Sequence, residues 1–165
     1  MARKLDCCEM PTSQNVRFCC ELQPENAMEH PPGGSIARLV REDLVERGWN
    51  PSELDNWRDS GWVFFCPSKN AELQLVLAPM ATPSHWLLQI SPKHLPGVIG
   101  RLFGRRTSAS ITDVYAIATD VHETISKLAD VTSIQWCWDG VPQDNNSSQE
   151  PTMPSDSEAT SGATG

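Results

Sequence analysis

Residues 62–91 read WVFFCPSKNAELQLVLAPMATPSHWLLQIS, and they decide the fold that the sequence predicts. Three runs in this stretch, 62–66, 72–78 and 85–91, are rich in β-forming residues or alternate at period two. The connections between them are short and contain Pro, Ser and other turn-forming residues. This pattern is typical of an antiparallel meander of three strands.

An amphipathic helix is expected before the meander, over residues 35–47. Its apolar residues recur at helical spacing, and Ser35 is suited to the N-cap because its hydroxyl can accept a bond from a free backbone N–H. Asp43 and Arg47 are four residues apart in the order that favours an ion pair along the helix. Gly48 is suited to the position that follows the last turn.

A second helix is expected after the meander, and it has the strongest pattern in the chain. It begins with a capping box formed by Ser110 and Asp113, and its apolar stripe continues to Leu128. Residues 133–138 are expected to form a last strand, and residues 52–57 a single helical turn between the first helix and the meander.

These elements predict an α+β fold in the order α-β-β-β-α-β. A four-stranded, mainly antiparallel sheet with two helices packed on one face would bury the apolar stripe of both helices. The predicted single domain spans residues 35–143. The order of elements, together with the acidic pI, resembles that of the small dimeric secretion chaperones, which hold unfolded segments of other proteins on apolar patches.

The two ends of the chain lack the periodic patterns of the middle. Residues 1–34 contain several Pro and Gly residues and are expected to be a disordered leader, and one hypothesis is that the natural protein begins at Met28. Residues 144–165 carry four acidic residues and no Lys or Arg, with almost no apolar side chains. We expect them to be a disordered acidic tail, because they cannot bury enough apolar surface to offset the loss of chain entropy.

Composition narrows the classes of partner. The 165 residues carry a net charge of −8, which disfavours a nucleic-acid partner, and no run approaches the ~18 apolar residues of a membrane helix. Vicinal cysteine pairs at 7–8 and 19–20 suit neither disulfides nor a zinc site, whose ligands are usually spaced by two to four residues. We therefore expect a cytoplasmic protein with reduced thiols, no cofactor, no metal, and no membrane or nucleic-acid partner.

Tryptophans on the predicted strands are the main candidates for a binding surface. Trp62, Trp86, Trp136 and Trp138 all lie in these strands, and neither face of the predicted sheet is fully polar. One interpretation places the four side chains in the core under the helices. The other places them on a partly covered face that docks a protein partner or a second copy of the chain.

Two further groups of residues suggest other functions. Arg101, Arg105 and Arg106 form the one local basic cluster and are suited to a phosphate or another anion. His85, His94, His122 and Cys137 could serve a small hydrolase if the fold brought them together, but the sequence has no nucleophile or phosphate-loop motif. We therefore predict no catalytic residue.

The predicted function is a non-enzymatic interaction module. It would bind a partner segment, or a second copy of itself as a homodimer, through an apolar sheet surface that contains tryptophan. The alternatives are a small-ligand or phosphate-binding regulatory domain that uses the arginines, and the small hydrolase.

Overall fold

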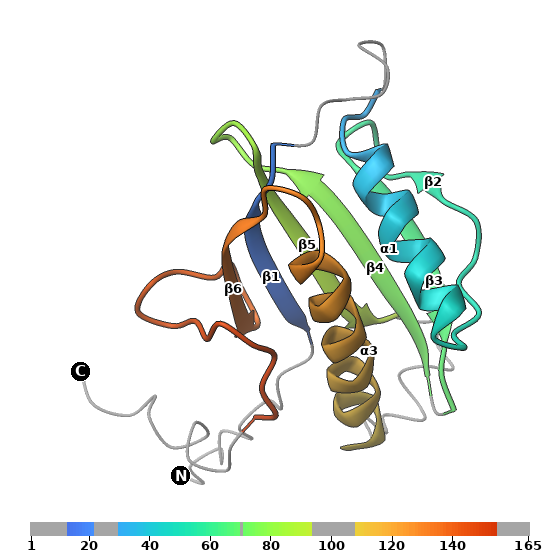
Figure 1. The fold of residues 1–165 in the computed structure, drawn as a ribbon. Coiled ribbons are helices and arrows are strands. Elements are labelled where there is room, and N and C mark those ends of the chain that lie inside the picture. Colours follow the sequence, from blue (N-terminus) through green and yellow to red (C-terminus); the bar gives the residue numbers. More distant parts are fainter. Residues whose placement is uncertain (1–12, 22–29, 70, 94–107, 155–165) are drawn as a thin grey trace, which may run out of the picture.

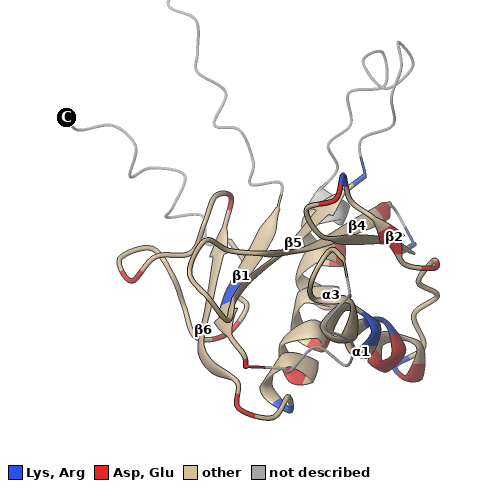
Figure 2. Ribbon diagram, turned by 90° about the horizontal axis from the view of Figure 1, so that it is seen from above, with Lys and Arg blue, Asp and Glu red and all other residues tan. Residues whose placement is uncertain are grey.

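The structure is a computed structural model that describes residues 13–21, 30–69, 71–93 and 108–154. The elements follow one another as β1 (Gln14–Cys19), α1 (Gly34–Glu46), β2 (Asp55–Asn56), β3 (Trp62–Pro67), β4 (Glu72–Pro79), β5 (His85–Pro92), α3 (Ser108–Ser126) and β6 (Thr132–Trp138). The strands form one antiparallel sheet in the order β2-β3-β4-β5-β1-β6. Both helices lie on the same side of this sheet (Figures 1 and 2). Neither is long and apolar enough to cross a membrane.

The predicted α+β class, the antiparallel meander and the two helices are confirmed. The prediction of four strands is wrong, because the described part of the sheet has six, and the predicted element order is wrong with it. The resemblance to the secretion chaperones depended on that order and is not retained. The first helix begins one residue before Ser35, and its N-cap is Gly33 rather than Ser35.

Gly33 explains why a serine cap is not used. Its backbone is left-handed, with φ of 94°, and a Cβ at this position would lie 2.5 Å from Cζ3 of Trp86. Only glycine lets the chain enter α1 this close to the indole ring. The other end of the helix follows the prediction, because Gly48 has φ of 90° and donates its N–H to the carbonyl of Val45.

Strand β1 lies inside the segment that was expected to be a disordered leader. It pairs with β5 on one side and β6 on the other, and Val16 and Phe18 have no exposed surface. The prediction is therefore wrong for residues 14–19. A chain that began at Met28 would lack the strand that connects β6 to the rest of the sheet (Figure 1).

The helical turn expected at 52–57 is also wrong. Asp55 and Asn56 form β2, which pairs with Val63 and Trp62 at the outer edge of β3. Ser52 extends this contact, because its N–H donates to the carbonyl of Phe65 and its hydroxyl accepts from the N–H of Phe65. These bonds satisfy backbone groups of β3 that would otherwise face outward, and so they determine the path of the segment.

The described part of the acidic tail, residues 144–154, is ordered against β6. Ser148 exchanges two backbone hydrogen bonds with Trp136, and the carbonyl of Thr152 accepts a bond from Trp138. The prediction of disorder is therefore wrong for these residues, which bridge β6 at Ser148 and then reach the side chains of Trp138 and Gln14. The segment is held mainly by hydrogen bonds of polar groups. The prediction of disorder considered only the burial of apolar side chains.

The core lies between the helices and one face of the sheet. Along β4 and β5, alternate side chains point to this face and are buried, as period two requires. The helices contribute apolar stripes to this core, although Leu39, which has the spacing expected of the stripe on α1, is 43% exposed. The largest fully buried members are Phe18, Ile36, Leu44, Phe64, Leu73, Leu75, Leu77, Leu88, Ile90, Ile117, Ile125 and Trp136.

Candidate functional site

The four tryptophans predicted to dock a partner all belong to the helix-covered side of the molecule. Trp86 and Trp136 are 8% and 1% exposed, whereas Trp62 and Trp138 are half-buried and pack against the core. Each indole N–H donates within the chain. The acceptors are the carbonyl of Pro31 for Trp62, that of Cys20 for Trp86, the ring of His122 for Trp136 and the carbonyl of Thr152 for Trp138.

These bonds give the tryptophans a structural role within the chain. A buried indole without a hydrogen-bond acceptor would cost about 1–3 kcal/mol, so each partner stabilises the position of its ring. Trp138 differs from the other three, because its acceptor lies in the 144–154 segment rather than in the body of the fold.

The contact between Trp136 and His122 fixes the form of the imidazole ring. Nε1 of Trp136 donates to Nδ1 of His122 at 3.1 Å, and the two rings meet edge to face. Because an indole can only donate, Nδ1 must be the unprotonated nitrogen, and the neutral ring carries its proton on Nε2. Nε2 in turn lies 3.5 Å from the hydroxyl oxygen of Ser126.

An open depression lies beside this histidine, between the end of α3, the start of β6 and the C-terminal segment. It is lined by His122, Val131, Thr132, Ser133, Ile134, Gln149 and Glu150. Ser133 has a positive φ of 55° at the point where β6 loses register with β1. Such a bulge redirects the side chains around it and leaves this part of the strand without regular pairing.

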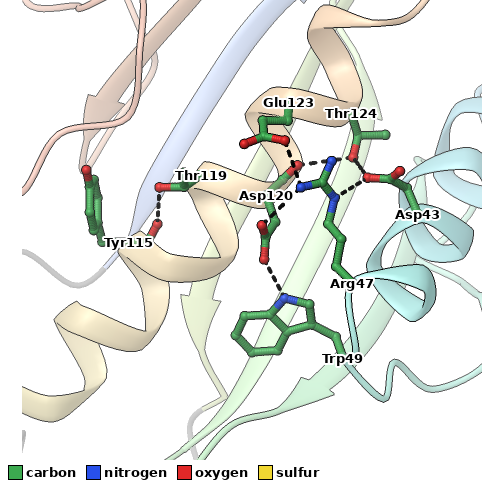
Figure 3. Close-up of polar contacts among 8 residues, drawn as sticks. All are labelled: Asp43, Arg47, Trp49, Tyr115, Thr119, Asp120, Glu123 and Thr124. Atoms are coloured by element: carbon green, nitrogen blue, oxygen red, sulfur yellow. Dashed lines mark hydrogen bonds and ion pairs between the residues drawn. The ribbon is translucent and has the colours of Figure 1, made fainter.

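A polar cluster joins the two helices (Figure 3). Arg47 lies between three carboxylates, at 2.6 Å from Asp43, 3.3 Å from Asp120 and 2.9 Å from Glu123. The indole of Trp49 donates to Asp120 at 2.7 Å, and the hydroxyl of Thr124 donates to Asp43. The cluster confirms the predicted Asp43–Arg47 pair and extends it to α3. Sequence spacing could not show the extension, because it depends on how the helices pack.

Electrostatics in this cluster favour the charged forms. The hydroxyl of Thr124, followed by Arg47, lowers the pKa of Asp43 below its ordinary value, although partial burial opposes the shift. Hydrogen bonds to Asp43 and Glu123 raise the pKa of Arg47. Every member of the cluster has a partner of opposite charge or a hydrogen bond, so the arrangement stabilises the contact between α1 and α3.

The described histidine and cysteine candidates do not converge. His122 contacts Trp136 on the helix side, whereas Cys137, the next residue of β6, points to the opposite face. His85 lies at the start of β5, with Nδ1 at 2.9 Å from the carbonyl of Pro83. Burial raises the pKa of the Cys137 thiol, and it raises that of Cys66 to about 11, so neither is an activated thiolate.

Two sets of predicted residues lie outside the described part of the chain. They are His94 and the arginine cluster of Arg101, Arg105 and Arg106. Within the ranges that the structure describes, no group of three His, Cys, Asp or Glu side chains is arranged to hold a metal ion.

The face of the sheet opposite the helices, called here the open face, carries a mixture of apolar and polar side chains. Phe65, Ala78 and Leu87 are half-buried on β3, β4 and β5, and Val63 and Val76 pair directly across β3 and β4. No described helix covers these residues (Figure 2). The polar side chains that surround them are Arg17, Gln74, Gln89 and Gln135.

A further group, which sequence patterns did not indicate, lies where β1 and β6 meet the 144–154 segment. Gln14 has no exposed surface, and its Nε2 donates at 3.0 Å to the carbonyl of Thr152, the same oxygen that accepts from Trp138 at 2.7 Å. Oε1 of Gln14 is buried without a hydrogen-bond partner in the described structure. A lone glutamine in a segment without periodicity gives no signal, because its importance depends on strand pairing across the whole domain.

Comparisons of the chain with protein-family models, with curated proteins and with solved structures give no match, so the function has to be argued from the geometry alone.

Proposed function

We propose that this protein is a non-enzymatic interaction module that associates with a second copy of itself through the open face of its sheet. The observation that supports this proposal is the row of apolar side chains on a face without a covering helix. Phe65, Ala78 and Leu87 are only half-buried in the single chain. Contact with an equivalent face would remove them from water and contribute about 25 cal/mol for each Å² of apolar surface buried.

The arrangement of this face suits a symmetric dimer. On β3, β4 and β5 the apolar residues lie among Gln74 and Gln89, whereas Arg17 and Gln135 lie beyond them on β1 and β6. A mixture of apolar and polar side chains is the usual composition of a non-obligate interface. The same patch on two copies can pair about a two-fold axis, which is the commonest symmetry of homo-oligomers.

The proposal moves the predicted surface from one face of the sheet to the other. The tryptophan-bearing face packs under α1 and α3, so the surface proposed here consists of the alternate residues on the same strands. The separation of His85, His122 and Cys137 favours an interaction role over the hydrolase alternative.

Light scattering coupled to size-exclusion chromatography tests the proposal. We expect wild type to become dimeric as its concentration rises, and Leu87→Glu to remain monomeric, because a carboxylate in the centre of the contact would lose its water. Leu39→Glu is the matched control, since Leu39 is 43% exposed on α1 and the substitution adds the same charge away from the open face. A wild-type chain that stays monomeric at all concentrations, or two variants that behave alike, would contradict the proposal.

A further inference from the structure

The outer edge of β6 is only partly paired. Trp136 donates to the carbonyl of Ser148 at 2.8 Å and accepts from its N–H at 2.9 Å, and this isolated bridge is the one strand pairing described on that side. In an antiparallel strand, every second residue directs its backbone groups to the same edge. Ile134 and Trp138 therefore direct theirs to the same side as Trp136, so a longer partner strand could pair with them.

The segment that occupies this edge is a poor strand partner. Pro151 and Pro154 hold φ at about −65°, whereas an antiparallel strand has φ of about −140°. After Ser148 the carbonyl of Thr152 accepts from the side chains of Trp138 and Gln14. Met153, the one large apolar residue of the segment, is 46% exposed and contributes little burial. The contacts of the segment thus come from its backbone and its polar side chains.

Donor groups approach the segment from both faces of the sheet. Trp138 and Gln14 both direct N–H groups at the carbonyl of Thr152, and Gln135 donates to Asp144 at 2.7 Å. Arg17 lies 3.7 Å from the same carboxylate. Such a surface recognises acceptor-rich chains, in particular acidic ones.

We propose that the outer edge of β6 is a binding site for an extended, acidic segment of another protein, which adds to the sheet as a further strand. Residues 144–154 are its resident occupant and mimic the partner with Asp144 and the Ser148 bridge. A partner without proline at the positions of Pro151 and Pro154 would form a longer ladder. Strand addition of this kind takes its affinity from main-chain hydrogen bonds.

A peptide-binding experiment on the full-length chain tests the site. Ser148→Pro removes the N–H that holds the resident segment, whereas Ser148→Ala retains it and serves as the matched control. The probe is a fluorescein-labelled peptide of residues 144–154 that carries Pro151→Thr and Pro154→Thr. A tethered segment competes at millimolar effective concentration, so we expect Ser148→Pro to bind the probe at least ~10-fold more tightly than wild type or Ser148→Ala. Equal binding by the two variants, or no binding, would overturn the proposal.

Two further measurements test the preference of the site for acidic segments and its location at β6. A second probe with Asp144→Lys and Glu150→Lys should bind at least ~10-fold more weakly, because it would place cations beside Arg17 and the other donors. Addition of the first probe to wild type at millimolar concentration should slow hydrogen exchange at the amides of Ile134 and Trp138, a result that does not depend on the folding of any variant. Equal affinity for both probes, or protection elsewhere on the sheet, would contradict the site. The outcome is independent of self-association, which involves Leu87 on the open face.

Discussion

β1 and the 144–154 segment lie on opposite sides of β6, and both come from parts of the chain whose composition predicts disorder. β1 forms two ladders and buries Val16 and Phe18 completely. The 144–154 segment forms one bridge and is otherwise held by side-chain hydrogen bonds. The difference teaches that position in the sheet, rather than composition, decides which of the two segments is part of the core.

If β1 is part of the core, substitutions in it should cause the largest loss of stability. Phe18→Ala should lower the free energy of unfolding by about 3–5 kcal/mol. The Phe18 side chain has no exposed surface, so its removal leaves a cavity under the helices. Arg17 precedes Phe18 and lies on the open face, so Arg17→Ala should lower the free energy of unfolding by less than about 1 kcal/mol. Urea unfolding followed by tryptophan fluorescence measures both. Equal losses would mean that β1 does not contribute to the core as described.

A loss of stability of intermediate size is expected when the contact between α1 and α3 is weakened. Asp43→Asn should lower the free energy of unfolding at neutral pH by about 1.5–3 kcal/mol, since it weakens charge-assisted bonds from Thr124 and Arg47. Because the folded pKa of Asp43 is depressed, its stabilisation is complete above the unfolded pKa of about 3.9 and is lost as the pH falls through the folded value.

Thermal unfolding between pH 7 and pH 3 measures this dependence. The difference between wild type and Asp43→Asn should narrow below pH ~4. Glu46→Gln, an exposed acid on the same helix, should change stability by no more than about 0.5 kcal/mol. A difference that does not depend on pH would show that the carboxylate is not stabilised by its neighbours.

The smallest loss of stability is expected for a substitution in the 144–154 segment. Ser148→Pro should cost about 0.5–1.5 kcal/mol, the net value of one hydrogen bond at an edge. In wild type, hydrogen exchange should be faster at the amides of Trp136 and Ser148 than at the hydrogen-bonded amides of β1, because only global opening breaks the two ladders. Equal protection would show that the segment belongs to the same cooperative unit as β1.

The helices and the meander could be predicted because their signals are local and repeated. Val114 to Leu128 forms a stripe over four turns, and Leu73, Leu75 and Leu77 alternate without interruption. β1 has only Val16 and Phe18 at the required spacing, within a longer segment of Pro, Gly and Cys residues. A six-residue strand does not stand out when the composition of the whole segment is averaged.

The sites were harder to predict for a different reason. Alternation correctly assigned Trp86 and Trp136 to one face of their strands, but it contains no information on which face the helices cover. The bonds of Arg47 to α3 join residues more than 70 positions apart, and the bond of Gln14 to Thr152 joins residues more than 130 positions apart. Such contacts follow from tertiary packing, and no local spacing encodes them.

The place of β1 in the sheet also determines when the protein can fold during its synthesis. Gln14 pairs with Ile90 on one side and with Trp138 on the other. β1 therefore cannot complete its pairing until β6 has left the ribosome. Until then Val16 and Phe18 stay exposed on the nascent chain. A fold that depends on pairings this distant is expected to form slowly, and its early strand is exposed to aggregation in the interval.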